Sequence, residues 1–250
     1  TAGKLATFSD NFSPALDNTT LASLPANWTY AWTSPADGAT RATDHPCGTL
    51  YYYEDGTLYQ LVDGRVKLDM EGDTAKPGFA TATVTGIFAG KSDAAVPSGL
   101  VVANHSAPTL VQGANTPPAI QVNRKGLPIS KWSLTDGGSL TSPEDPNTTY
   151  GFGAGQLGGR EVMFGCDPLA TLVATRNTLS EIAAFTNYPI GLRFGYTASN
   201  RWSLLLPVVQ PVDEGTGKRG EYRSNDLSFQ AIPSGRDAQN RDCTRIMCFY

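Results

Sequence analysis

Residues suited to nucleophilic or metal chemistry are few in this chain of 250 residues, and they are widely spaced. The two histidines and four cysteines are His45, His105, Cys47, Cys166, Cys243 and Cys248. Two pairings, Cys47–His105 and Cys166–His45, remain open as a nucleophile with its base, but no local signature accompanies either. No cysteine pair has the C-x-x-C spacing of zinc ribbons or thioredoxin-like sites. We favour free thiols over the alternative of two disulfides in a secreted protein, which allows three pairings.

Two further patterns resemble catalytic or binding motifs. Residues 153–158 match G-x-G-x-x-G, which binds a pyrophosphate only between a strand and a helix. Here a polar, proline-containing loop precedes the motif and no helical pattern follows, so we interpret it as a flexible loop. Asp69 and Glu71 share one face of a strand pattern, as paired catalytic carboxylates do, but alternating charge is typical of a solvated face. The sequence therefore predicts no enzyme, no metal and no cofactor.

The composition limits the classes of partner. Net charge is −4 and the pI is about 5.2. These values argue against a surface that binds nucleic acid, but not against a pore through which DNA passes. Lys218, Arg219 and Arg223 form a basic turn that is too small to hold DNA. Only 17% of residues are charged, with 26 Gly and 17 Pro, which favours many short strands and a surface reserved for other subunits. No apolar run approaches the ~18 residues of a membrane span, and the first residues contain no apolar signal core.

The elements that position these residues are organised around residues 49–88. Two β-prone runs, residues 50–53 and 57–62, are joined by Asp55-Gly56, a strong hairpin signal. In residues 66–71, Val66, Leu68 and Met70 alternate with Lys67, Asp69 and Glu71. Residues 80–88 alternate again after a Pro-Gly turn. We expect a four-stranded antiparallel meander with one apolar and one polar face, which needs a second layer and partners for its edges.

The rest of the chain contains weaker signals. A capping box at Thr178–Glu181 predicts a helix over residues 178–187, and a weaker pattern predicts one over 13–24. Residues 139–160 are expected to form an exposed loop. Further strands are expected at residues 119–123, 131–134, 190–196, 201–206, 208–212 and 226–232.

The later strands repeat the order of the first meander at an offset of about 142 to 144 residues. The chain is therefore interpreted as two pseudo-repeated β-units, residues 1–135 and 136–250, with one short helix each. Two unrelated meanders are the alternative.

One family resembles this chain from Cys47 onward, over CGTLYYYEDGTLYQLVDGRVKLDMEGDTAKPGFATATVTGIFAGKSDAAVPSG. These residues, with PTLVQGAN and SNDLSFQAIPSGRD further on, resemble the tail tube (major tail) proteins of long-tailed bacteriophages. The resemblance covers residues 47–115 well and 190–250 loosely. It implies an antiparallel β-sandwich or barrel flanked by a helix, whose edge strands join neighbouring subunits in a ring. Tubes of this family are six-fold or pseudo-six-fold, so the resemblance predicts a three-fold ring for a duplicated chain, and a six-fold ring of one-unit chains is the other possibility.

The resemblance also implies a role. Stacked rings of the subunit would form the channel for genome delivery in the virion tail, after assembly in the host cytoplasm. Partners would be further copies of the chain and other tail proteins, with DNA passing transiently and no membrane involved. Asp69 and Glu71 are the candidates for lumen-facing charges, because a lining that repels phosphate does not retain DNA.

Two other classes stay open. Another phage virion protein, of capsid or baseplate, would have the same β-rich composition. A secreted carbohydrate-binding β-sandwich would explain the five Asn-x-Ser/Thr triplets, at Asn11, Asn18, Asn27, Asn104 and Asn147, and the ten tyrosines. Glycans and disulfides in an intact mass spectrum belong to the secreted class only.

Overall fold

The computed structural model describes residues 3–5, 30–33, 48–96, 110–112, 119–159, 161–195, 202–233 and 244–249. Within them, thirteen strands form one sheet, and a pair of two-residue strands lies apart from it. The helix expected at residues 13–24 lies outside the described residues. The prediction of a mostly antiparallel β protein is confirmed.

The elements follow the chain in this order. The strands are β1 (Gly3–Leu5), β2 (Tyr30–Thr33), β3 (Gly48–Glu54), β4 (Thr57–Asp73), β5 (Phe79–Asp93), β6 (Ile120–Val122), β7 (Lys125–Gly126), β8 (Lys131–Thr135), β9 (Leu140–Thr141), β10 (Gln156–Leu157), β11 (Met163–Cys166), β12 (Tyr188–Phe194), β13 (Trp202–Arg219), β14 (Tyr222–Ala231) and β15 (Ile246–Phe249). The helix is α2 (Thr178–Ala183). Its N-cap is Asn177, whose side chain accepts a hydrogen bond from the Ser180 backbone N–H, so the predicted cap at Thr178 is wrong by one residue.

The first meander has three strands, not the four expected. Residues 57–62 and 66–71 belong to one strand, β4, because Asp63 and Gly64 form a bulge in it where a turn was expected. Asp63 has φ +51° and the register shifts between Val62 and Arg65. Likewise β13 is one strand across the expected break after residue 206, with a register shift between Pro211 and Asp213. Bulges let these long strands bend without ending.

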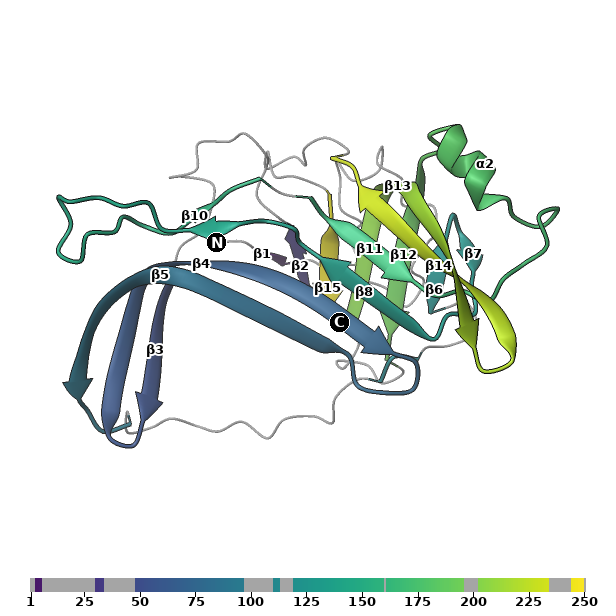
Figure 1. Ribbon diagram of the computed structural model, residues 1–250. Coiled ribbons are helices and arrows are strands. Elements are labelled where there is room, and N and C mark those ends of the chain that lie inside the picture. The colour runs from purple at the N-terminus through teal and green to yellow at the C-terminus, as the bar shows by residue number, and fades with distance from the viewer. Residues whose placement is uncertain are drawn as a thin grey trace.

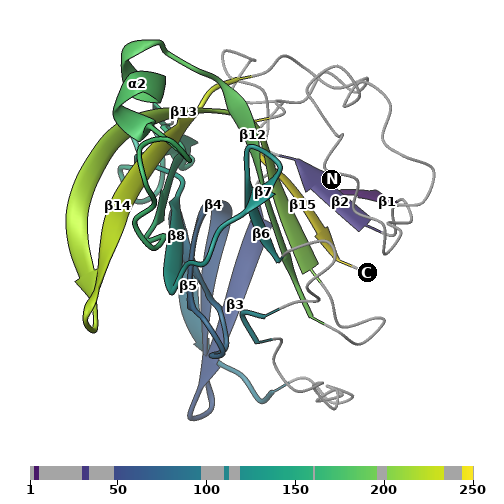
Figure 2. The same ribbon diagram turned by 90° about the vertical axis from the view of Figure 1, so that its right-hand side faces the viewer.

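The sheet folds into two layers (Figures 1 and 2). Layer A contains, in order, β6, β12, the first half of β13, β15, β2 and β1. Layer B contains the second half of β13, then β14, β11, β8, β4 and β5. Aromatic rings join the layers: Trp132 of β8 stacks on Phe194 of β12 at 5.7 Å and lies 5.8 Å from Trp202 of β13. The largest fully buried side chains include Phe164, Phe229, Leu134, Ile190, Leu192, Leu204 and Leu206.

An arm extends from layer B (Figure 1). It consists of residues 48–66 and 84–96, with residues 140–157 running beside them. At its root the Arg65 Nε donates to the Gly155 carbonyl at 3.1 Å, and further out the Tyr150 hydroxyl donates to the Ala89 carbonyl at 3.2 Å. No second layer covers the arm among the described residues, so Val66, expected on the buried face, is 56% exposed. Met70, nearer the end of β4, belongs to the core, and Leu68 packs against it.

Both meanders have a short strand followed by two long ones, but they are placed differently. The first half of β4 lies in the arm, whereas the first half of β13 lies in layer A. Strands β8 and β11 pair with each other and join β4 to β14, so the described strands of both predicted units share one sheet.

Candidate assembly surface

Of the candidates for chemistry, Cys166 is described in full. His45, His105, Cys47 and Cys243 lie outside the described residues, and the side chain of Cys248 is not among those described. Cys166 is a free, buried thiol of the core. Burial raises its pKa to about 12, the direction opposite to that of a reactive nucleophile.

We therefore expect Cys166 to resist alkylation by iodoacetamide at pH 8 in the folded protein and to react after unfolding in urea. Folding keeps the thiol buried and protonated, and both effects suppress attack by the thiolate. Mass spectrometry of the peptide that contains Cys166 measures the labelling. Rapid modification of the native protein would contradict this placement.

The glycine motif does not have the arrangement that binds a phosphate. Within residues 153–158 the chain forms β10 in place of a helix N-terminus. The Gly153 N–H donates to the Pro143 carbonyl and the Gly158 N–H to the Ser139 carbonyl, each at 2.7 Å. These backbone donors are used within a hairpin in which β10 pairs with β9, so the stretch expected to be a flexible loop is in part a paired hairpin.

The face of layer B that points away from the core is polar. Paired residues form a row across it, one from each strand: Asp213, Ser228, Gly165, Ser133, Glu71 and Phe79. A groove of about 550 Å³ lies along this row, and Asp73 and Asp226 also line it. Small side chains in the middle of the row make the face hollow. Its exposed carboxylates are accompanied by Lys76 and Lys131, and Lys76 forms an ion pair with Asp73 at 2.9 Å, so Glu71 and Asp226 remain as the exposed carboxylates of the groove without such a pair among the described residues.

Asp69 and Glu71 share this polar face, as their alternation predicts. Glu71 is exposed in the groove. Asp69 is half-buried, accepts a hydrogen bond from the Asp136 backbone N–H at 2.8 Å and forms an ion pair with Lys67 at 3.3 Å. Lys67 therefore neutralises Asp69, and Glu71 is the stronger contributor to the charge of the groove.

Layer B ends in two open edges. On one side, β5 pairs with β4 alone among the residues that the structure describes, and residues 79–83 are all exposed, with Phe79 at 65%. Residues 79–84 contain neither charge nor proline, the features that protect natural edge strands from pairing. On the other side, residues 213–219 of β13 pair with β14 alone within the described part of the chain. An uncharged, exposed edge of this kind is a template for another strand.

Sequence reasoning missed several residues. Strands β11 and β15 were not expected, because four-residue strands carry little periodic signal. Arg245, which has no distinctive sequence signal, is buried in an ion pair with Asp136. The basic turn is larger than the sequence indicated, since Arg219 reaches the β6–β7 turn that contains Arg124 and Lys125.

Comparison with known proteins gives no match: neither a protein-family model nor a curated protein sequence matches this chain. No helix in the described ranges is long and apolar enough to cross a membrane. The described residues also contain no group of three or more His, Cys, Asp or Glu side chains placed to hold a metal ion.

Proposed function

We propose that the protein is a structural subunit of a bacteriophage tail tube, which polymerises through the open edges of layer B into stacked rings. The observation that carries the proposal is the exposed, uncharged edge of β5 at one side of a six-strand layer whose other side, β13, is also open. The phage assignment draws on the resemblance of residues 47–115 to tail tube proteins.

The directions of the strands favour pairing between copies. From β13 to β5, every neighbouring pair in layer B is antiparallel. The layer contains an even number of strands, so β13 and β5 run in opposite directions. A copy related by rotation about an axis therefore brings its β13 antiparallel to β5, and the ladder continues across the contact. Such a contact joins two different surfaces, and it closes into a ring when the rotation divides a full turn.

The polar face of layer B would then line the bore. Glu71, Asp213 and Asp226 are exposed on that face, whereas the exposed Asp73 forms an ion pair with Lys76 at 2.9 Å. Carboxylates repel phosphate, so a lining of this kind lets DNA pass without retaining it. The subunit would have no turnover of its own, and its partners would be further copies, other tail proteins and transient DNA.

Negative-stain microscopy of the purified protein tests the proposal. We expect rings or tubes of uniform bore, with three-fold symmetry for a duplicated chain or six-fold symmetry for a ring of six subunits. A cryo-EM map of the tube should place Glu71 at the lumen. A protein that stays monomeric at all concentrations, or a map with Glu71 on the outside of the tube, would contradict the proposal.

A further inference from the structure

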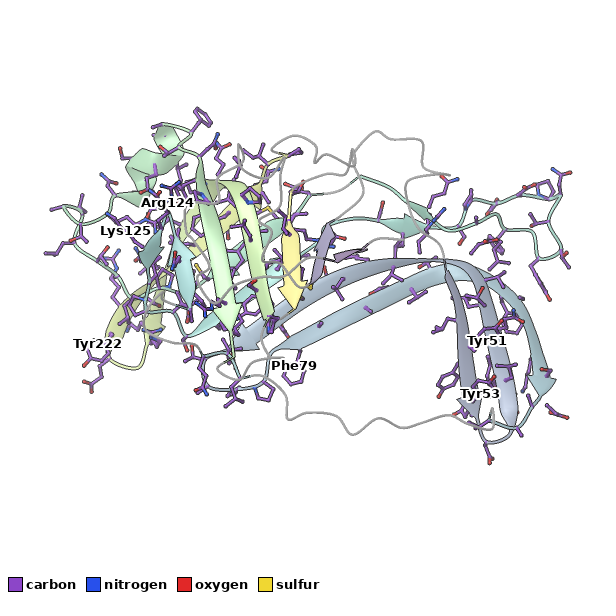
Figure 3. The ribbon with its side chains drawn as sticks, turned by 180° about the vertical axis from the view of Figure 1, so that it is seen from behind. Tyr51, Tyr53, Phe79, Arg124, Lys125 and Tyr222 are labelled. Carbon is purple, nitrogen blue, oxygen red and sulfur yellow. The ribbon has the colours of Figure 1, made fainter. Side chains whose placement is uncertain are left out.

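Two ends of the molecule differ in charge. They are the arm, which contains Tyr51, and the opposite end, which contains Arg124 and Lys125 (Figure 3). The arm contains many exposed or half-exposed carboxylates: Glu54, Asp55, Asp63, Asp93, Glu144 and Asp145. Against these stand Arg65, which is buried at the arm root, and Lys91, whose ammonium lies 5.2 Å from the centre of the Tyr59 ring. The arm surface is therefore strongly acidic.

The opposite end is basic. It consists of the turn at residues 123–128 and the tip of the β13–β14 hairpin at residues 218–223, which we call the basic end. Its cations are Arg124, Lys125, Lys218, Arg219 and Arg223. Glu221 is its acidic residue. The Arg219 Nη2 donates to the Pro128 carbonyl at 3.3 Å, which holds the turn and the hairpin tip together.

Both ends also expose large apolar side chains. On the arm, Tyr51 and Tyr52 are 53% and 56% exposed. At the basic end, Tyr222 is 72% exposed, and Leu172 and Val173 are exposed on the neighbouring loop. That loop is attached to the hairpin by the Ala170 N–H, which donates to the Arg223 carbonyl at 2.9 Å. Apolar side chains surrounded by charge are typical of protein–protein contacts.

We infer that the arm of one copy binds the basic end of a second copy, and that this contact stacks the rings with a fixed polarity. The inference rests on the proposed function and adds the partner surfaces to it. The arm contains the first half of β4, and the basic end contains the tip of the β13–β14 hairpin. The arm and the basic end therefore project from opposite ends of the strands of layer B (Figures 1 and 3). Edge pairing adds copies at the sides of the layer and leaves both ends free to meet copies above and below.

Complementary charge reversals test this contact. The arm variant is Glu54→Lys with Asp93→Lys, and the end variant is Lys125→Glu with Arg223→Glu. All four positions are exposed. We expect each variant to need about tenfold more protein than wild type before rings stack, since like charges then face each other across the contact. Light scattering measures the assembly and microscopy separates single rings from tubes.

An equimolar mixture of the two variants should recover stacking. A lysine-bearing arm then meets a glutamate-bearing end, and the unchanged arm meets the unchanged end. The control, Glu161→Lys, also reverses an exposed carboxylate but on neither end, and it should stack as wild type does.

Each result has a separate meaning. If the wild-type protein forms no rings, the tail tube proposal fails. If it forms tubes and both charge variants stack equally well, the arm contact is wrong while the tube stands. If both variants lose stacking but their mixture does not recover it, the two surfaces do not touch each other, and the inference is wrong.

Discussion

Proline at one of two neighbouring positions in β5, Ala82 or Thr83, should leave the protein folded but abolish its assembly. Successive backbone N–H groups of a strand point to opposite edges, so one of these two donates toward β4 and the other toward the open edge. Proline removes that donor and is tolerated in a strand only where the N–H faces solvent. The variant that loses the outward donor keeps its ladder with β4 but cannot continue it into a neighbouring copy.

The other variant of the pair is its matched control. It loses a hydrogen bond to β4 and should unfold more easily, by about 1 kcal/mol or more. Urea unfolding followed by circular dichroism measures stability, and sedimentation velocity measures assembly. The two readouts should separate: one variant stable and monomeric, the other destabilised. If neither position affects assembly in a folded protein, β5 is not the edge that pairs.

Local sequence patterns predicted which strands and turns exist better than they predicted where each strand begins and ends. The Asp55-Gly56 hairpin is present, with both residues at positive φ, because turn chemistry acts over two residues. The lengths of β4 and β13 were not predictable from the same reasoning. Asp63-Gly64 has turn-forming residues, and whether such a pair ends a strand or bulges within it depends on the strands beside it.

The polar face was predictable only in part. Alternation placed Asp69 and Glu71 on one face correctly. It did not reveal that Ser133, Gly165 and Ser228 continue this face, because these residues come from strands far apart in the sequence and meet only through the register of the sheet. The arm was missed for a related reason: period-two alternation does not say how much of a strand has a second layer over it, and Val66 is exposed for that reason.

A buried ion pair has the least visible sequence signal and a large predicted effect on stability. Arg245 precedes β15 and Asp136 follows β8; the Arg245 Nη2 lies 3.3 Å from the Asp136 Oδ2, with side chains 2% and 4% exposed. The Arg245 Nη1 also donates to the Leu68 carbonyl of β4 at 3.1 Å. One guanidinium thus connects the C-terminal strand of layer A to two strands of layer B, which are the two layers that enclose the core.

Replacing Asp136 by alanine should therefore lower the free energy of unfolding by about 3–5 kcal/mol, because the guanidinium then stays buried without its carboxylate. That is a large part of the ~5–15 kcal/mol that stabilises a typical domain. Asp136→Asn keeps an acceptor without the charge and should lose less. Asp73→Ala removes an exposed pair with Lys76 at 2.9 Å and should change stability by about 1 kcal/mol or less. Chemical denaturation of the monomeric β5 variant avoids interference from assembly. Equal stability of Asp136→Ala and Asp73→Ala would mean that this pair does not hold the two layers together.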